Sequence, residues 1–114
     1  MKLILTLSMA ALLLGCGNLV KSGAIVEAQN AIDKNNYAEA LENTEIAESF
    51  GETSAEDTAK IHYLRALSLQ GLGRQQEALT SFRYVVEQHR SSAYAAPSRQ
   101  KLEAAGGLST LNSD

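Results

Sequence analysis

The feature that most constrains the fold of this chain is an internal repeat. The triplet Glu39-Ala40-Leu41 recurs 38 residues later as Glu77-Ala78-Leu79. Further positions match at the same spacing, namely Ala28 with Ala66, Asn35 with Gly73, and Ala47 with Val85. Self-similarity at periods of about 20–50 residues is typical of stacked units, each unable to bury its apolar face alone. The sequence therefore predicts two similar units packed against each other.

The second unit has the pattern of two helices. Ser54 to Asp57 resembles a capping box, in which the serine hydroxyl accepts a hydrogen bond from a free N–H of the first turn. A helix is expected from there to about Leu72, and glycines at 71 and 73 end it, because glycine is favoured just past a helix end. Apolar residues of the following helix recur on one face, at Ala78, Leu79, Phe82, Val85 and Val86.

The first unit repeats this plan, and a single helix follows the second. Ile25, Ala28, Ala31 and Ile32 mark the first helix. Asn35 is expected in the turn, because asparagine tolerates a left-handed backbone, and Asn36 is expected to cap the next helix. A last helix is expected to begin in the region marked by Ser91, Ser92 and Pro97, and to end near Ala105. Since no apolar–polar alternation predicts a strand, we expect an all-α protein.

This arrangement resembles the tetratricopeptide repeat family. Leu72-Gly73 fits the turn of that motif, Ala78 its small residue at the helix crossing, and Phe82 its large apolar position. The match is partial. In the first helix of the second unit, His62 and Arg65 stand where the family has large apolar residues. In the first unit, Thr44 stands at the position that Phe82 occupies in the second unit, where a large apolar residue is usual. The repeat is also longer than the usual period of about 34 residues, and the loop 50–55 can absorb the excess. The resemblance implies a short α-solenoid of about two helical hairpins plus a C-terminal capping helix, over residues 21–105.

The same resemblance implies a concave groove lined by the first helix of each pair, suited to an extended peptide or a helix. Carried over residue by residue, the groove positions are Ser22, Ile25, Gln29 and Ile32 in the first unit and Lys60, Tyr63, Leu67 and Gln70 in the second. In so small a stack, Ile25, Tyr63 and Leu67 have an alternative interpretation as core residues.

The N-terminus has the layout of an export signal. Met1-Lys2 is a short positive region, and the stretch from Leu3 to Leu14 carries no charge. Twelve helical residues span roughly 18 Å, well short of the ~30 Å hydrocarbon core, so residues 1–15 are expected to be a cleaved signal peptide rather than a membrane span. The sequence Leu-Leu-Gly-Cys that ends at Cys16 resembles the lipobox of bacterial lipoproteins.

That resemblance implies that Cys16 becomes the first mature residue and is acylated with diacylglycerol and palmitate. An intramolecular disulfide is excluded, because Cys16 is the single cysteine. Residues 16–20 are then a lipidated tether and residues 106–114 a disordered tail. Gly17 stands where an aspartate would retain a lipoprotein at the inner membrane, so we expect the periplasmic face of the outer membrane.

Charge and motifs argue against other classes of function. Residues 17–57 carry two basic and nine acidic side chains, a net of −7, while residues 58–114 carry seven basic and four acidic, a net of +3. The basic residues are scattered without interleaved aromatics, which disfavours nucleic acid. His62 and His89 have no ligand at a metal-binding spacing, and Glu39, Glu42 and Glu45 form a solvated helix face. We expect no enzyme, no metal and no cofactor.

Two classes of function remain. The first is a membrane-anchored module in the cell envelope that binds another envelope protein or peptide. The alternative is a pilotin-like or scaffold subunit needed to assemble an envelope or secretion complex. Two repeats fall below the usual minimum of about three for a stable stack, so a second copy of the chain is a further candidate partner.

Overall fold

A computed structural model of the chain describes residues 19–51 and 54–106. The signal peptide expected over 1–15, the acylation expected at Cys16 and the tail residues 107–114 lie outside the described residues. Helical backbone over residues 19–33 is followed by α2 (Tyr37–Ser49), α3 (Ala55–Gly71), α4 (Gln75–Gln88) and α5 (Ala95–Ala104). Every regular element within these described ranges is a helix, which confirms the predicted all-α class.

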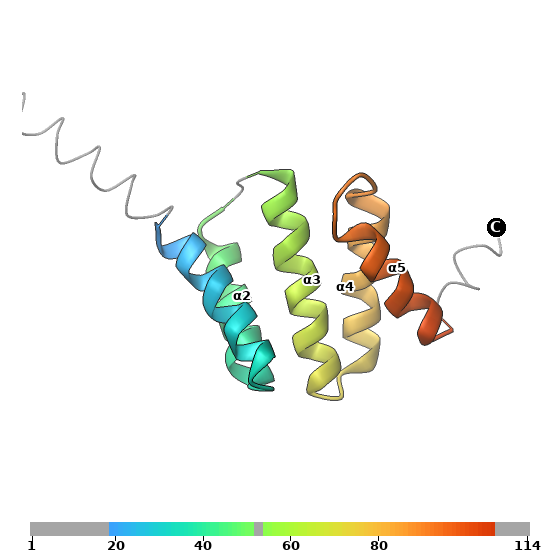
Figure 1. The fold of residues 1–114 in the computed structure, drawn as a ribbon, viewed down its shortest axis with the longest axis horizontal. Coiled ribbons are helices and arrows are strands. Elements are labelled where there is room, and N and C mark those ends of the chain that lie inside the picture. Colours follow the sequence, from blue (N-terminus) through green and yellow to red (C-terminus); the bar gives the residue numbers. More distant parts are fainter. Residues whose placement is uncertain (1–18, 52–53, 107–114) are drawn as a thin grey trace, which may run out of the picture.

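The helices pack in chain order. α2 packs on α3, α3 on α4, and α4 on α5. In Figure 1 the 19–33 stretch, α3 and α5 lie on the near side, while α2 and α4 lie behind them. The two sides of the molecule are therefore built from different helices, and each can present its own surface.

The capping of α3 follows the sequence prediction, whereas that of α2 does not. Ser54 has extended backbone (φ −65°, ψ 153°), and its Oγ accepts a hydrogen bond from the Asp57 N–H at 3.1 Å. Asn36 precedes α2 but its side chain makes no capping bond, so the prediction that it caps this helix is wrong. Its backbone (φ −89°, ψ 69°) departs from the extended conformation that capping side chains usually need.

The two helix–helix turns have the same geometry, 38 residues apart. Asn35 (φ 61°) and Gly73 (φ 78°) both adopt the left-handed conformation, as expected for the turn. The N–H of the following residue then donates back to the first helix, from Asn36 to Ala31 at 2.7 Å and from Arg74 to Leu69 at 2.9 Å. These bonds satisfy carbonyls that the helix end leaves free. The sequence repeat is therefore also a repeat of backbone conformation.

The core is built on small side chains. Among the described residues, six alanines are wholly buried, at positions 28, 40, 47, 59, 66 and 78. One apolar cluster joins the 19–33 stretch to α2 and α3, and a second joins α2, α3, α4 and α5 around Phe82 and Leu102. Leu67 packs against both clusters. The alanines allow the helix backbones to approach closely, and the few large residues fill the space between them.

Positions matched by the repeat share the same degree of burial. Ala40 and Ala78 are both wholly buried, as are Ala47 and Val85, and Leu41 and Leu79 are 9% and 8% exposed. Thr44, which stands where Phe82 does in the second unit, is buried too, and its Oγ1 donates to the Leu41 carbonyl at 2.6 Å. Burial of the hydroxyl is thus matched by a local hydrogen bond.

The first helix begins earlier than the sequence suggested. Residues 19 and 20 have helical backbone although they were expected in the tether. Neither proline nor glycine stands at residues 19–22 to interrupt the helix. None of the helices within the described residues is both long and apolar enough to cross a bilayer.

Candidate interaction surfaces

All the predicted groove residues belong to the 19–33 stretch and α3, but their exposure differs. Ser22 and Gln29 are exposed, and Ile25 is buried in the first apolar cluster at 7% exposure. The others are partly buried, namely Ile32, Lys60, Tyr63, Leu67 and Gln70. Ile25 therefore serves the core and offers little surface to a ligand, while the remaining positions keep some accessible area.

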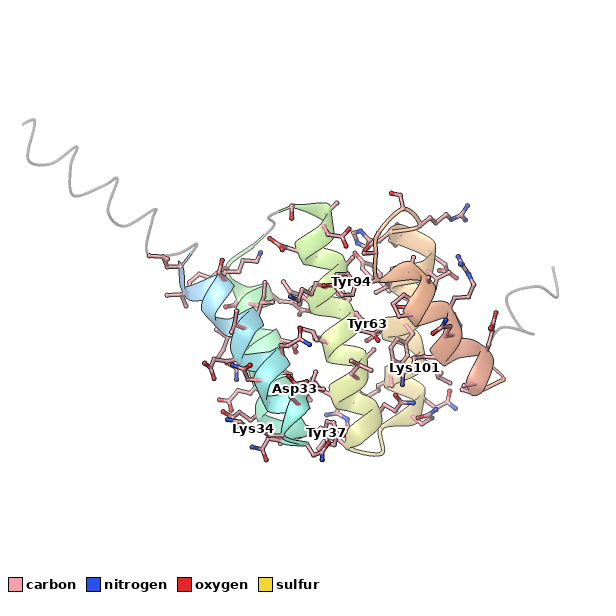
Figure 2. All side chains as sticks on the ribbon, in the orientation of Figure 1. Asp33, Lys34, Tyr37, Tyr63, Tyr94 and Lys101 are labelled. Atoms are coloured by element: carbon pink, nitrogen blue, oxygen red, sulfur yellow. The ribbon has the colours of Figure 1, made fainter. Side chains whose placement is uncertain are left out.

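Tyr63 is the centre of an aromatic group on the near side of the molecule. Its ring centroid lies 5.9 Å from that of Phe82 in α4 and 5.4 Å from that of Tyr94, the residue before α5. The rings are tilted by 59° and 38°, which are favourable arrangements for aromatic pairs. Figure 2 shows Tyr63, Tyr94 and Lys101 along the junction of α3 with α5.

The environment of Tyr63 keeps its hydroxyl protonated. Burial raises the pKa of Tyr63, and the neighbouring Tyr94 hydroxyl raises it further. A phenol in this state both donates and accepts hydrogen bonds at neutral pH. Tyr63 therefore adds a hydrogen-bonding group to this aromatic group.

A polar contact holds Tyr94 beside Tyr63. Glu56, in the first turn of α3, accepts hydrogen bonds through Oε1 from the Ser92 hydroxyl at 3.0 Å and the Ala93 N–H at 3.1 Å. Ser92 Oγ in turn accepts from the Tyr94 N–H at 3.0 Å. These bonds connect the start of α3 to the link between α4 and α5, so the entry to α5 is fixed relative to α3.

A cleft lies on the opposite side of α3, facing α2 and α4. Helical periodicity places His62, Arg65 and Leu69 away from Lys60, Tyr63 and Leu67. Two hollows adjoin there, with volumes of about 330 and about 230 Å³. Both are lined by His62 and Tyr84, whose ring centroids lie 4.2 Å apart. The two hollows are thus parts of one cleft.

Glu48 of α2 brings charge into this cleft. Its carboxylate lies 3.3 Å from Arg65 Nη1 and 3.8 Å from His62 Nδ1. Oε1 of Glu48 is buried and has no hydrogen-bond partner among the described residues. A ligand group that donates a hydrogen bond would satisfy this oxygen.

The surroundings of His62 favour its neutral form. Burial lowers the pKa of His62 below its usual value, and nearby Arg65 and His89 lower it further, while Glu48 acts in the opposite direction. Burial is the largest of these effects. The neutral imidazole is therefore favoured in the cleft, where its ring is tilted by 45° against that of Tyr84.

Lys21 closes one end of the cleft. Its side chain is buried at 4% exposure for the residue, and its Nζ donates a hydrogen bond to the Gly51 carbonyl. This contact joins the first turns of the 19–33 stretch to the end of α2. A buried ammonium needs such a partner, because an unpaired charge in the interior is costly.

The chemistry that these two surfaces offer is hydrogen bonding, ion pairing and aromatic contact. Within residues 19–51 and 54–106, no group of three or more His, Cys, Asp or Glu side chains is placed to hold a metal ion. The near side offers aromatic and aliphatic area with polar neighbours, and the far side offers a cleft of mixed charge.

Several residues of these surfaces were not identified from the sequence. Tyr94, Glu48 and Tyr84 come together with α3 only through packing between helices. The burial of Lys21 could have been predicted, because helical periodicity places it on the same face as Ala24, Ile25 and Ala28. His62 and Arg65 also carried a signal, because they depart from the apolar residues of the family pattern, and the structure places both in the cleft.

Comparisons with models of known protein families, with curated proteins and with solved structures found no match to this chain.

Proposed function

We propose that this chain is a membrane-anchored protein-interaction module of the bacterial cell envelope. Acylated Cys16 holds it at the periplasmic face of the outer membrane, where more than one acyl chain makes anchoring durable. The ligand is a peptide segment or helix of another envelope protein. It binds the near side formed by the 19–33 stretch, α3 and α5, without nucleic acid or cofactor.

A short tetratricopeptide-like solenoid is the architecture we infer for this module. Three observations support it: the turns at Asn35 and Gly73 have the same geometry, matched positions share the same burial, and consecutive helices pack in chain order. In such a stack α5 acts as the capping helix, covering the second hairpin through Leu102. The first helices of successive pairs then share one surface.

The observation that carries the function is the composition of that surface around Tyr63. Tyr63, Tyr94 and Leu67 are only partly buried, so aromatic and aliphatic area stays accessible beside the core. Lys60, Gln70 and Lys101 are partly exposed around them. A few rigid apolar anchors surrounded by polar side chains are typical of the energetic centre of protein interfaces.

Site-specific photo-crosslinking in cells tests this proposal. A photoreactive amino acid replaces Leu67 or Gln70 on the near side, and Gln76, an exposed residue of α4, serves as the matched control. We expect a discrete adduct from positions 67 and 70 and none from position 76. Equal adduct patterns at all three positions would contradict the assigned surface. An adduct of twice the mass of the chain would instead support self-association.

A further inference from the structure

Exposed apolar side chains gather at one corner of the molecule. Leu19 is 74% exposed, Val26 55% and Val20 47%, all on the first helical turns of the described chain. Phe50, 47% exposed, precedes Gly51, whose carbonyl accepts the hydrogen bond from Lys21, so Phe50 lies beside the same turns. We call Leu19, Val20, Val26 and Phe50 the apolar corner. Figure 1 shows both chain segments, the start of the 19–33 stretch and the end of α2, at the same end of the molecule.

The apolar corner is not a by-product of core packing. On the 19–33 helix the buried face carries Lys21, Ala24, Ile25 and Ala28. Helical periodicity places Leu19 and Val26 on the outward face, together with Gly23 and Asn30. The outward face is apolar in its first two turns and polar beyond them, at Asn30 and Asp33. The apolar surface is thus confined to the end of the helix nearest Cys16.

The position of Cys16 indicates what covers this corner. Two residues, Gly17 and Asn18, separate it from Leu19, so the three residue-to-residue steps between them span at most about 11 Å even when extended. If Cys16 carries acyl chains in the bilayer, the first turns of the helix must lie at the headgroup region. There, exposed aliphatic and aromatic side chains are removed from water by lipid.

We propose that the apolar corner inserts into the lipid interface and sets the orientation of the domain on the membrane. This inference rests on the proposed lipid anchor and deepens it, since it assigns a second membrane contact made by the folded domain itself. The near side around Tyr63 then remains accessible, because it extends across α3 to α5, away from the corner.

Tryptophan fluorescence tests the proposal directly, because the natural sequence contains no tryptophan. The full mature chain with its natural acylation is inserted into vesicles of phosphatidylethanolamine and phosphatidylglycerol, with or without bromine on the acyl chains. Val26→Trp and Phe50→Trp report on the apolar corner. Leu72→Trp is the matched control. Leu72 is 41% exposed and directly follows α3, so the length of that helix places it roughly 25 Å from the start of α3.

We expect brominated lipid to quench the emission of Val26→Trp and Phe50→Trp and to leave that of Leu72→Trp unchanged. If the acylated protein pellets with the vesicles but all three variants emit alike, the inference is overturned while the anchor stands. A blue shift in the emission of Val26→Trp that grows with the number of protein molecules per vesicle, without quenching, would overturn the inference. It would show instead that a second copy of the chain covers the apolar corner. A chain that carries no acyl group and does not pellet would overturn the anchor and the inference together.

Discussion

At the scale of single residues, His62 couples the stability of the fold to pH. Its pKa is lowered in the folded chain, mainly by burial, so protons bind more readily to the unfolded chain. The stabilisation from neutral His62 is therefore complete above its unfolded pKa of about 6.5. It is lost as the pH falls through the lowered value of the folded state. The charged groups around it are Glu48 on α2, Arg65 on its own helix and His89 after α4.

His62→Gln is expected to remove this part of the pH dependence. Urea unfolding midpoints of the wild type and the variant, measured in matched buffers at pH 7.5 and 5.5, provide the test. The wild type should lose more stability than the variant on acidification. If both lose the same amount, burial does not control the titration of His62.

Gly71 makes a second prediction at this scale. It is the last residue of α3, and a Cβ there would clash with the ring of Tyr37, the first residue of α2. Gly71→Ala should lower the free energy of unfolding by about 1–3 kcal/mol, the typical cost of overpacking. In a Tyr37→Ala background the same change should be neutral or stabilising by up to about 1 kcal/mol, because alanine favours helix over glycine. Chemical denaturation of the four proteins gives the coupling, and simple additivity of the two changes would exclude this contact.

At the scale of helices, the crossing of α3 with α4 depends on a small residue at position 78. Ala78 is wholly buried beside Ala66 and Leu69. Ala78→Leu should cost about 1–3 kcal/mol, which corresponds to a fall of roughly 4–8 °C in Tm for each kcal/mol. Gln75→Leu is the control, since Gln75 is exposed on the same helix. Thermal unfolding of both variants is the measurement, and equal falls in Tm would contradict the position of α4.

Whether a feature of the helices can be predicted from the sequence depends on how far apart its residues lie along the chain. The cap at Ser54 and the turns at Asn35 and Gly73 were predictable, because they depend on neighbours within a few residues. The contacts of Glu48 with Arg65 and of Glu56 with Ser92 were not, because they require the relative placement of different helices. The sequence also could not decide whether Ile25 lies in the core or lines the groove, because both positions predict the same apolar periodicity.

At the scale of the whole molecule, the lipid anchor and the helical domain are expected to be separable. The described domain contains its own apolar clusters, so we expect it to fold without acylation of Cys16. Cys16→Ser should therefore yield a precursor that retains residues 1–15, takes up no labelled palmitate and still unfolds cooperatively. Electrophoretic mobility, palmitate labelling and circular dichroism of the same preparation report the three properties. If Cys16→Ser matches the wild type in mobility and labelling, acylation at Cys16 is excluded and the proposed localisation loses its basis. If labelling is lost and the helical signal is lost as well, the domain depends on the anchor for its folding, and the two are not separable.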